Sequence, residues 1–150
     1  MASTSERIGK PAGGRAPGGA AILRTFPPIS RHVLALYCGA SGDSNPIHVD
    51  LDYARAAGFP DVFAHGMLVM AYLGLALEEA GPRAGIRSLA VRFVAITQLN
   101  ATITCEARVG EVGAETIALD LVARDEAGDV KLQGSAVVDR ATWGERLGQA

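Results

Sequence analysis

The second half of the chain alternates apolar and polar residues in a way that predicts β-strands. The clearest case is residues 101–109, where Ala, Ile, Cys, Ala and Val occupy every second position. Alternation with a period of two places one set of side chains on one face of a strand. We expect strands over 88–96, 101–109, 115–124 and 129–138. The Gly-rich and acidic segments between the last three have the length of hairpin turns, which predicts an antiparallel meander.

The longest apolar segment, 66–77, is too long for an ordinary strand and ends in Glu78 and Glu79. We expect a helix of about fifteen residues, roughly 22 Å long, that begins near Gly66. Because no face of this segment is polar, protein is expected to cover the helix on most sides.

Shorter elements precede this helix. Residues 21–26 read as a short strand ended by two prolines. Ser30 is in position to cap a helix over 31–40, and Asp50 to cap another over 51–58. The segment that follows, "FPDVFAHG", is expected to be a loop that leads into the long helix.

One buried helix followed by several strands predicts an α+β domain with an antiparallel sheet curled around the helix. This is the arrangement of the hot-dog fold. A length of 150 residues, 49% hydrophobic and 20% charged, agrees with a single globular domain. Residues 1–20 are rich in Gly, Pro and Ser, so we expect a disordered tail there and the domain over 21–150.

Composition also narrows the function. A net charge of −2 and an aromatic content of 5% argue against nucleic-acid binding. No apolar run reaches the length of a membrane span, and residues 1–20 lack the apolar core of a secretory signal, so we expect a cytoplasmic protein. Cys38 and Cys105 match no metal or redox spacing, and both are interpreted as reduced core thiols.

Residues 41–50, "SGDSNPIHVD", gather Asp43, Asn45, His48 and Asp50 around a proline that excludes a helix interior or a central strand. These residue types are common in surface turns, which is the simplest interpretation. However, a carboxylate and an imidazole five residues apart on one constrained loop can both contact a single water, as general acid–base chemistry requires. Asp43 and His48 are therefore candidate catalytic residues. Asp50 is interpreted as a helix cap, and Asn45 either fastens the loop or contacts substrate.

Together with "HGML" at 65–68, the segment "YCGASGDSNPIHVD" resembles the MaoC-like family of R-specific enoyl-CoA hydratases and dehydratases. The resemblance runs from about Phe26 to Val138, and it implies the same hot-dog fold. Two features depart from the family: "LNAT" at 99–102, where members commonly have a Gly-Asp turn, and the N-terminal tail. Neither touches the expected chemistry.

The resemblance implies a lyase that reversibly hydrates trans-2-enoyl thioesters to (3R)-3-hydroxyacyl thioesters. It implies Asp43 and His48 as the catalytic side chains and the backbone N–H of Gly66 as the donor to the thioester carbonyl. A helix start suits that donor, since free N–H groups and the dipole favour negative charge there. The substrate would be an acyl-CoA or an acyl-carrier-protein thioester, and the protein a homodimer or a dimer of dimers.

We expect no cofactor. A metal is not expected either, because the spacing of the acidic and histidine residues matches no known ligand pattern. The loop over 53–65 is expected to line the acyl site with Phe59, Val62 and Phe63, although anchoring in the core would also explain these residues. His65 either contacts the substrate or packs and caps at the start of the helix.

Three alternatives share the expected fold. The first is a (3R)-hydroxyacyl-carrier-protein dehydratase of fatty-acid synthesis. The second is a thioesterase, which would need a carboxylate on or near the central helix, whereas residues 66–77 contain none. The third is a non-catalytic acyl-binding subunit, which would be expected to lack Asp43 or His48.

Overall fold

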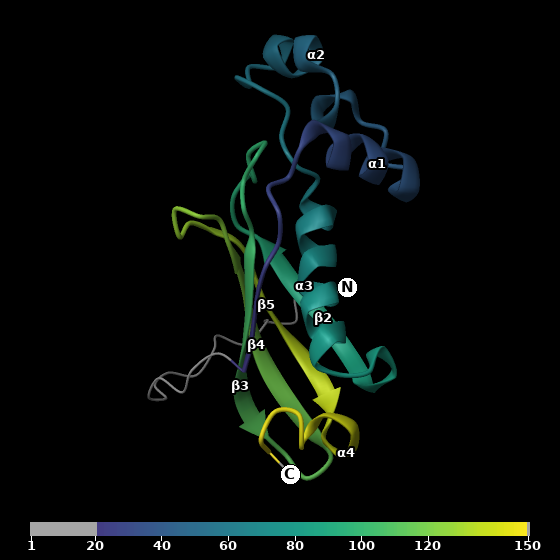
Figure 1. The fold of residues 1–150 in the computed structure, drawn as a ribbon, viewed down its shortest axis with the longest axis vertical. Coiled ribbons are helices and arrows are strands. Elements are labelled where there is room, and N and C mark those ends of the chain that lie inside the picture. Colours follow the sequence, from purple (N-terminus) through teal and green to yellow (C-terminus); the bar gives the residue numbers. More distant parts are fainter. Residues whose placement is uncertain (1–20, 150) are drawn as a thin grey trace, which may run out of the picture.

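The computed structural model describes residues 21–149, so the tail expected over 1–20 lies outside the described residues. Five strands form one antiparallel sheet in the order β1-β3-β4-β5-β2 (Figure 1). They are β1 (Ile22–Thr25), β2 (Ile86–Phe93), β3 (Thr104–Val112), β4 (Thr116–Arg124) and β5 (Val130–Asp139). The α+β class and the wrapped antiparallel sheet predicted from the sequence are confirmed.

Helical segments precede the four longer strands and close the described chain. They are α1 (Arg31–Ser41), η1 (Pro46–His48), α2 (Leu51–Ala56), α3 (Gly66–Ala80), η2 (Arg83–Gly85) and α4 (Arg140–Trp143). Both predicted caps are present: Ser30 Oγ accepts from the N–H of Val33, and Asp50 accepts from the N–H groups of Asp52 and Tyr53. Among the described residues, no helix has the length and apolar character that crossing a membrane requires.

The four predicted strands follow one another along the chain as expected, but the sequence predicted hairpin turns only between the last three and left the place of β2 in the sheet open. Strands β3, β4 and β5 form the expected meander, but β2 pairs with β5 at the far edge of the sheet rather than with β3. β2 also ends at Phe93 rather than at residue 96. The N–H groups of Val94 and Ala95 both reach the carbonyl of Lys131, so the chain leaves the strand there and crosses to β3.

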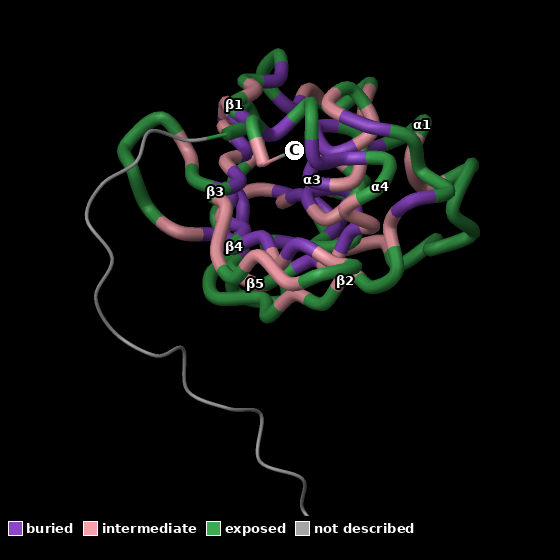
Figure 2. Tube along the Cα trace, turned by 90° about the horizontal axis from the view of Figure 1, so that it is seen from below, coloured by how far each residue is buried: buried purple, intermediate pink, exposed green. Residues whose placement is uncertain are grey.

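Helix α3 lies against the sheet and contacts β1, β3, β4 and β5. Its inward face is buried, and Leu73 and Leu77 are each 1% exposed. Burying a leucine of this kind contributes roughly 1.5–3 kcal/mol relative to leaving it in water. Figure 2 shows buried positions concentrated along α3 and the neighbouring strands, which together form the core.

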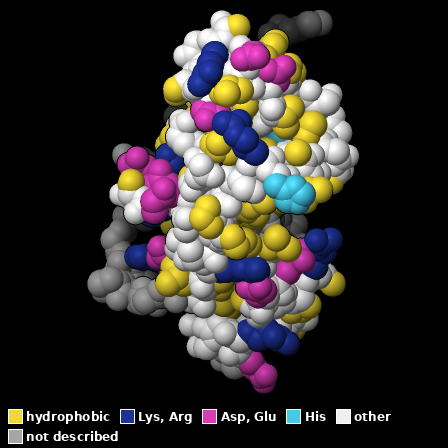
Figure 3. Space-filling model, turned by 45° about the horizontal axis from the view of Figure 1, so that its top comes forward, with side chains coloured by type: hydrophobic (Ala, Val, Ile, Leu, Met, Phe, Trp, Pro, Cys, Tyr) yellow, Lys and Arg dark blue, Asp and Glu magenta, His cyan; other side chains and the backbone are white. Residues whose placement is uncertain are grey.

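The outward face of α3 is not covered, contrary to the expectation that protein surrounds this helix. Met67 and Leu75 are 52% and 44% exposed, and Ala71, one turn from each, is also exposed. These three residues form an apolar stripe along the helix. Apolar side chains gather on the middle of the face seen in Figure 3, with charged side chains above and below them. Within one copy of the described chain, this stripe faces solvent.

The two cysteines are free. Cys105 on β3 is completely buried, and burial raises the pKa of its thiol to about 12, so it is an inert core thiol as expected. Cys38 on α1 is only partly buried.

Candidate active site

Asp43 lies on the loop that connects α1 to η1, and short-range hydrogen bonds within this loop hold it in shape. Gly42 ends α1 with a φ of 75°, a left-handed conformation that glycine adopts without strain. Asp43 Oδ1 then accepts from the N–H of Asn45 at 3.3 Å, and Asn45 Oδ1 accepts from the N–H of Ile47 at 3.1 Å. Of the two interpretations of Asn45, the structure shows the one in which it fastens the loop. Asp43 itself is exposed to solvent.

His48 lies at the end of η1 and is only 9% exposed. Its Nδ1 lies 2.8 Å from the carbonyl oxygen of Phe63. A carbonyl only accepts hydrogen bonds, so Nδ1 carries the proton and donates it, and Nε2 of the neutral ring keeps its lone pair. The Phe63 ring meets the His48 ring edge-on at 5.1 Å. The main chain of Phe63 thus selects the tautomer of His48.

His65 lies next to His48, at the N-cap position of α3, although its side chain makes no capping hydrogen bond. It is 1% exposed, and its Nε2 lies 3.2 Å from the backbone carbonyl oxygen of Asp43. Its ring stacks on His48 at 3.9 Å between centroids, and Tyr37 packs on it at 5.0 Å. Burial, reinforced by the neighbouring His48, lowers the pKa of His65 below its ordinary value.

The structure therefore brings together three groups that the sequence separates by up to 22 positions. A carboxylate oxygen of Asp43 and one ring nitrogen from each of His48 and His65 lie within 4.8 Å of one another. Such a set could hold a metal ion. However, the lone pair of an imidazole lies in the ring plane, and these two planes are stacked only 28° apart, so the lone pairs do not converge readily on one point. The geometry favours acid–base chemistry.

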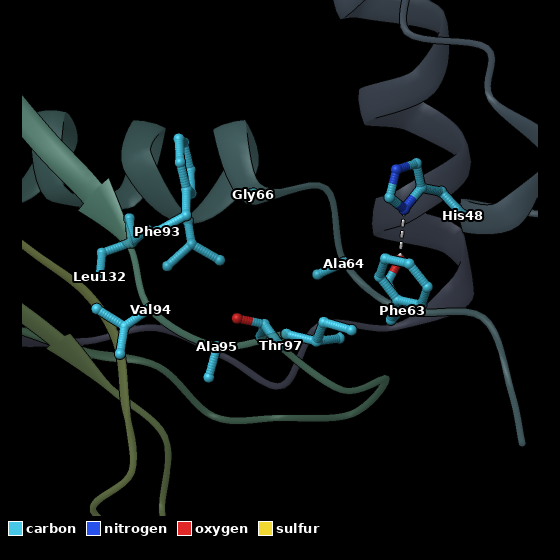
Figure 4. Close-up of a pocket in the computed structure, with 11 residues that line it drawn as sticks. His48, Phe63, Ala64, Gly66, Phe93, Val94, Ala95, Thr97 and Leu132 are labelled. Carbon is cyan, nitrogen blue, oxygen red and sulfur yellow. Dashed lines mark hydrogen bonds between the residues drawn. The ribbon is translucent and has the colours of Figure 1, made fainter. Parts of the chain in front are cut away.

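A pocket of about 320 Å³ opens beside His48. Most of its wall is apolar, and Figure 4 shows the lining side chains grouped around it. The lining residues are His48, Phe63, Ala64, Gly66, Val69, Phe93, Val94, Ala95, Ile96, Thr97 and Leu132. The first turn of α3 reaches this pocket through Gly66, so the start of this helix and His48 both line the same pocket.

Gly66 is closely covered by the ring of Phe93. A Cβ on Gly66 would lie 2.8 Å from Phe93 Cε1. Two non-bonded carbon atoms do not come this close, so the Phe93 ring or the start of α3 would have to move. The absence of a side chain at Gly66 therefore lets the aromatic ring pack against the start of α3.

The predicted site residues divide into three groups. His48, Gly66 and Phe63 line the pocket, with Asp43 next to His48. Asn45 and His65 support the loop from outside the pocket wall.

Phe59 and Val62, the other two residues assigned to the acyl site, lie elsewhere. Phe59 is partly buried and packs on Phe63 at 4.9 Å between centroids. Val62 is completely buried in the core, which is the alternative that the sequence left open for it.

The sequence interpretation missed the residues that make up most of the pocket wall, 93–97 and Leu132. Residues 93–96 read Phe-Val-Ala-Ile, an apolar run without alternation at the end of a predicted strand. That loss of alternation was the available signal, since a strand with one polar face would not continue in this way.

Comparisons with known proteins place the chain in a family. A family model described as MaoC like domain matches residues 15–127. The chain is 34% identical over 113 residues to the (R)-specific enoyl-CoA hydratase of Rhodospirillum rubrum. This alignment covers 73% of this chain and 78% of that protein. It is 37% identical over 97 residues to 3-hydroxyacyl-thioester dehydratase X of Mycobacterium tuberculosis, covering 65% of this chain but only 32% of that protein.

Among solved structures, the unliganded R-hydratase PhaJ1 of Pseudomonas aeruginosa superimposes with a TM-score of 0.69. The two share 28% sequence identity, and the match covers 77% of this chain and 76% of the other. The fold is therefore the hot-dog fold, as the sequence predicted. Family model, identity and fold agree, and the chain is an enzyme that belongs to the MaoC-like family of hydratases and dehydratases.

Proposed function

We propose that this protein reversibly hydrates trans-2-enoyl thioesters to (3R)-3-hydroxyacyl thioesters. The observation that carries the proposal is the placement of the Asp43 carboxylate and the His48 imidazole beside an apolar pocket whose wall includes Gly66. A conjugated thioester needs a group that takes a proton from water, a donor for the oxygen that becomes negative, and an apolar space for its acyl chain. These three features lie together here.

The hydrogen bonds of His48 support a division of labour between the two side chains. Because Nδ1 donates to the carbonyl of Phe63, Nε2 is left to accept a hydrogen bond from the attacking water. Asp43 takes the other proton of that water as its oxygen bonds to C3. The carboxyl group then returns the proton to C2, so that the carboxylate is regenerated. Acid–base assistance of this kind supplies about 10²- to 10⁴-fold in rate.

Gly66 is the proposed donor to the thioester oxygen. It is the first residue of a fifteen-residue helix, and the first N–H groups of any α-helix lack an intrahelical partner. Negative charge builds on the thioester oxygen as water adds, and the helix dipole favours that charge at this end. One such preorganised donor is worth roughly 3 kcal/mol of transition-state stabilisation.

The relatives support both directions of the reaction, since one is named as a hydratase and the other as a 3-hydroxyacyl-thioester dehydratase. Removal of water from a 3-hydroxyacyl thioester is the reverse of the proposed hydration and uses the same groups. The same site would therefore serve a hydratase of enoyl-CoA or, with a carrier-protein thioester as substrate, a dehydratase of fatty-acid synthesis.

We propose further that the protein is a homodimer, or a dimer of dimers. The apolar stripe of Met67, Ala71 and Leu75 is exposed, and β2 forms an open edge of the sheet. An open edge and an apolar stripe are both surfaces that a second copy can cover.

The decisive experiment is to incubate the purified protein with trans-2-enoyl-CoAs of several lengths and follow the loss of the conjugated double bond. Release of free thiol is measured in the same samples. Loss of conjugation without thiol release is the expected result. Thiol release would instead indicate a thioesterase, and no reaction with CoA or carrier-protein substrates would indicate a non-catalytic acyl-binding subunit.

A further inference from the structure

We propose that His65 is a positioning residue: its Nε2–H holds the main chain of Asp43, and its ring supports the imidazole of His48. This inference rests on the proposed function, because it takes Asp43 and His48 as the reacting groups. His65 does not line the pocket and is 1% exposed, so direct contact with substrate is not its role.

The bond to Asp43 connects an exposed loop to the buried start of α3. Other hydrogen bonds of the loop are local: the N–H of Asp43 reaches Ser41 Oγ, and Asp43 Oδ1 accepts from the N–H of Asn45. The bond from His65 Nε2 to the Asp43 carbonyl spans 22 positions. Among the described residues, it is the one hydrogen bond recorded for Asp43 that ties it to a distant part of the chain. Losing it would leave the carboxylate on a loop held only by its neighbours.

The stacking on His48 restricts the second member of the pair. The bond from Nδ1 to the Phe63 carbonyl fixes one point of the His48 ring but allows rotation about that point. The His65 ring, 3.9 Å away and 28° from parallel, limits this rotation from one side. Together the two contacts determine where Nε2 points. A displacement of about 1 Å at such a group can lower the rate about a hundredfold.

The tautomer of His65 follows from the same contacts. Because the Asp43 carbonyl accepts from Nε2, the proton of the neutral ring is on Nε2 and the lone pair is on Nδ1. Nδ1 is buried and has no hydrogen-bond partner among the described residues. A second proton on Nδ1 would therefore create a buried, unpaired donor next to His48.

Three titratable groups face the His65 ring: Tyr37 from α1, Asp43 from the loop and His48 from η1. Burial and His48 act against a charged His65, while Asp43 acts in its favour, and the net effect is a lowered pKa. Neutral His65 therefore provides the N–H donor and the flat ring without adding positive charge beside the base.

The test separates the donor from the ring. His65→Gln keeps an N–H donor but removes the ring, His65→Phe keeps a ring but removes the donor, and His65→Leu removes both. His32→Gln is the matched control, since His32 is exposed on α1. For each variant, kcat, KM and Tm are measured with a trans-2-enoyl-CoA, and the pH profile of kcat is compared with that of the unaltered protein.

We expect kcat to fall roughly 10- to 100-fold in His65→Phe and further in His65→Leu, with KM changed less than about threefold. The KM is expected to hold because His65 does not line the acyl pocket. The acid limb of the pH profile should also move in the variants, because a titrating neighbour of His48 has been removed. Unchanged kcat in a folded His65→Leu variant would overturn the inference. A higher KM together with a lower Tm, with the pH profile of kcat unmoved, would also overturn it, because it would indicate a merely structural role.

A second measurement does not depend on the variants folding or on activity. Nitrogen chemical shifts of the imidazoles in the unaltered protein report which nitrogen of His65 carries the proton. The inference requires a neutral ring with the proton on Nε2 at pH 7, and a proton on Nδ1 would overturn it. If the unaltered protein does not hydrate enoyl thioesters, the proposed function fails, and these shifts still test the geometry on their own.

Discussion

The imidazole rings of His48 and His65 stack with their centroids 3.9 Å apart, although one ends a short turn and the other precedes a long helix. Each ring has one nitrogen bound to a backbone carbonyl, of Phe63 and Asp43 respectively. The two imidazoles therefore differ in the surroundings of their second ring nitrogen. His48 lines the pocket, whereas His65 lies behind the wall and its free nitrogen is buried and unpaired within the described part of the chain.

Removing either reacting group should abolish most activity. We expect Asp43→Asn and His48→Ala each to lower hydration by at least about a hundredfold, because each removes one acid–base partner of the water. Circular dichroism and Tm check that the variants are folded. Asp50→Asn is the control, since Asn caps a helix as well as Asp does and the residue lies in the same segment. Near-normal rates in a folded Asp43→Asn or His48→Ala protein would contradict the assignment.

Phe63 and Val62 are adjacent in sequence but should respond differently to truncation. Phe63 lines the pocket, so Phe63→Ala is expected to raise the relative rate on longer acyl chains more than it changes stability. Val62 is fully buried in the core, so Val62→Ala should lower Tm and reduce rates uniformly across chain lengths. A length series of enoyl-CoAs combined with thermal unfolding measures both effects. If the two variants behave alike, Phe63 does not set the acyl length.

Gly66 and Phe93 should be coupled. Gly66→Ala keeps the backbone N–H, but its new Cβ would lie 2.8 Å from Phe93 Cε1, so the ring or the start of α3 must move. We expect a loss of kcat in Gly66→Ala that is smaller when Phe93 is also Ala, because the smaller side chain leaves room for the methyl group. A double-mutant cycle on kcat/KM measures this coupling. Strict additivity of the two substitutions would show that the contact is unimportant.

Stability should fall on acidification partly because of His65. Its pKa in the folded protein is below the ordinary value of 6.5, first because of burial and second because of His48. The unfolded chain therefore binds more protons than the folded protein between those two pKa values. This contribution to stability is present above pH 6.5 and is lost as the pH falls through the folded-state pKa. Urea unfolding at several pH values should show a weaker acid dependence in His65→Phe, whereas His32→Gln should behave as the unaltered protein.

The exposed stripe on α3 should be needed for association. We expect Leu75→Glu to shift the protein toward monomer in sedimentation experiments, because it places a charge on an otherwise apolar face. Leu36→Glu is the control, since Leu36 is 60% exposed but belongs to α1 and not to this stripe. A stable, active monomer in the unaltered protein would argue against the proposed dimer.

Local patterns in the sequence predicted most of the secondary structure and the central part of the site. Ser30 and Asp50 cap helices as expected, because capping depends only on a side chain and the backbone two or three residues ahead. The helix α3 follows from the length of an apolar run, and the strands β3 to β5 follow from alternation, and both signals are also local. The loop with Asp43 and His48 was recognisable because its residues are contiguous.

Tertiary structure decided everything that depends on which distant segments meet. The pairing of β2 with β5 rather than β3 was not predictable, because the backbone groups of a strand can pair with any partner of suitable register. The same holds for His65, whose role depends on a carbonyl 22 positions away, and for the pocket wall at 93–97, which exists only where β2 leaves the sheet. Patterns of neighbouring residues describe how each element forms, but the contacts among elements are selected by the packing of the whole core, and the pocket and the supports of the site are made of those contacts.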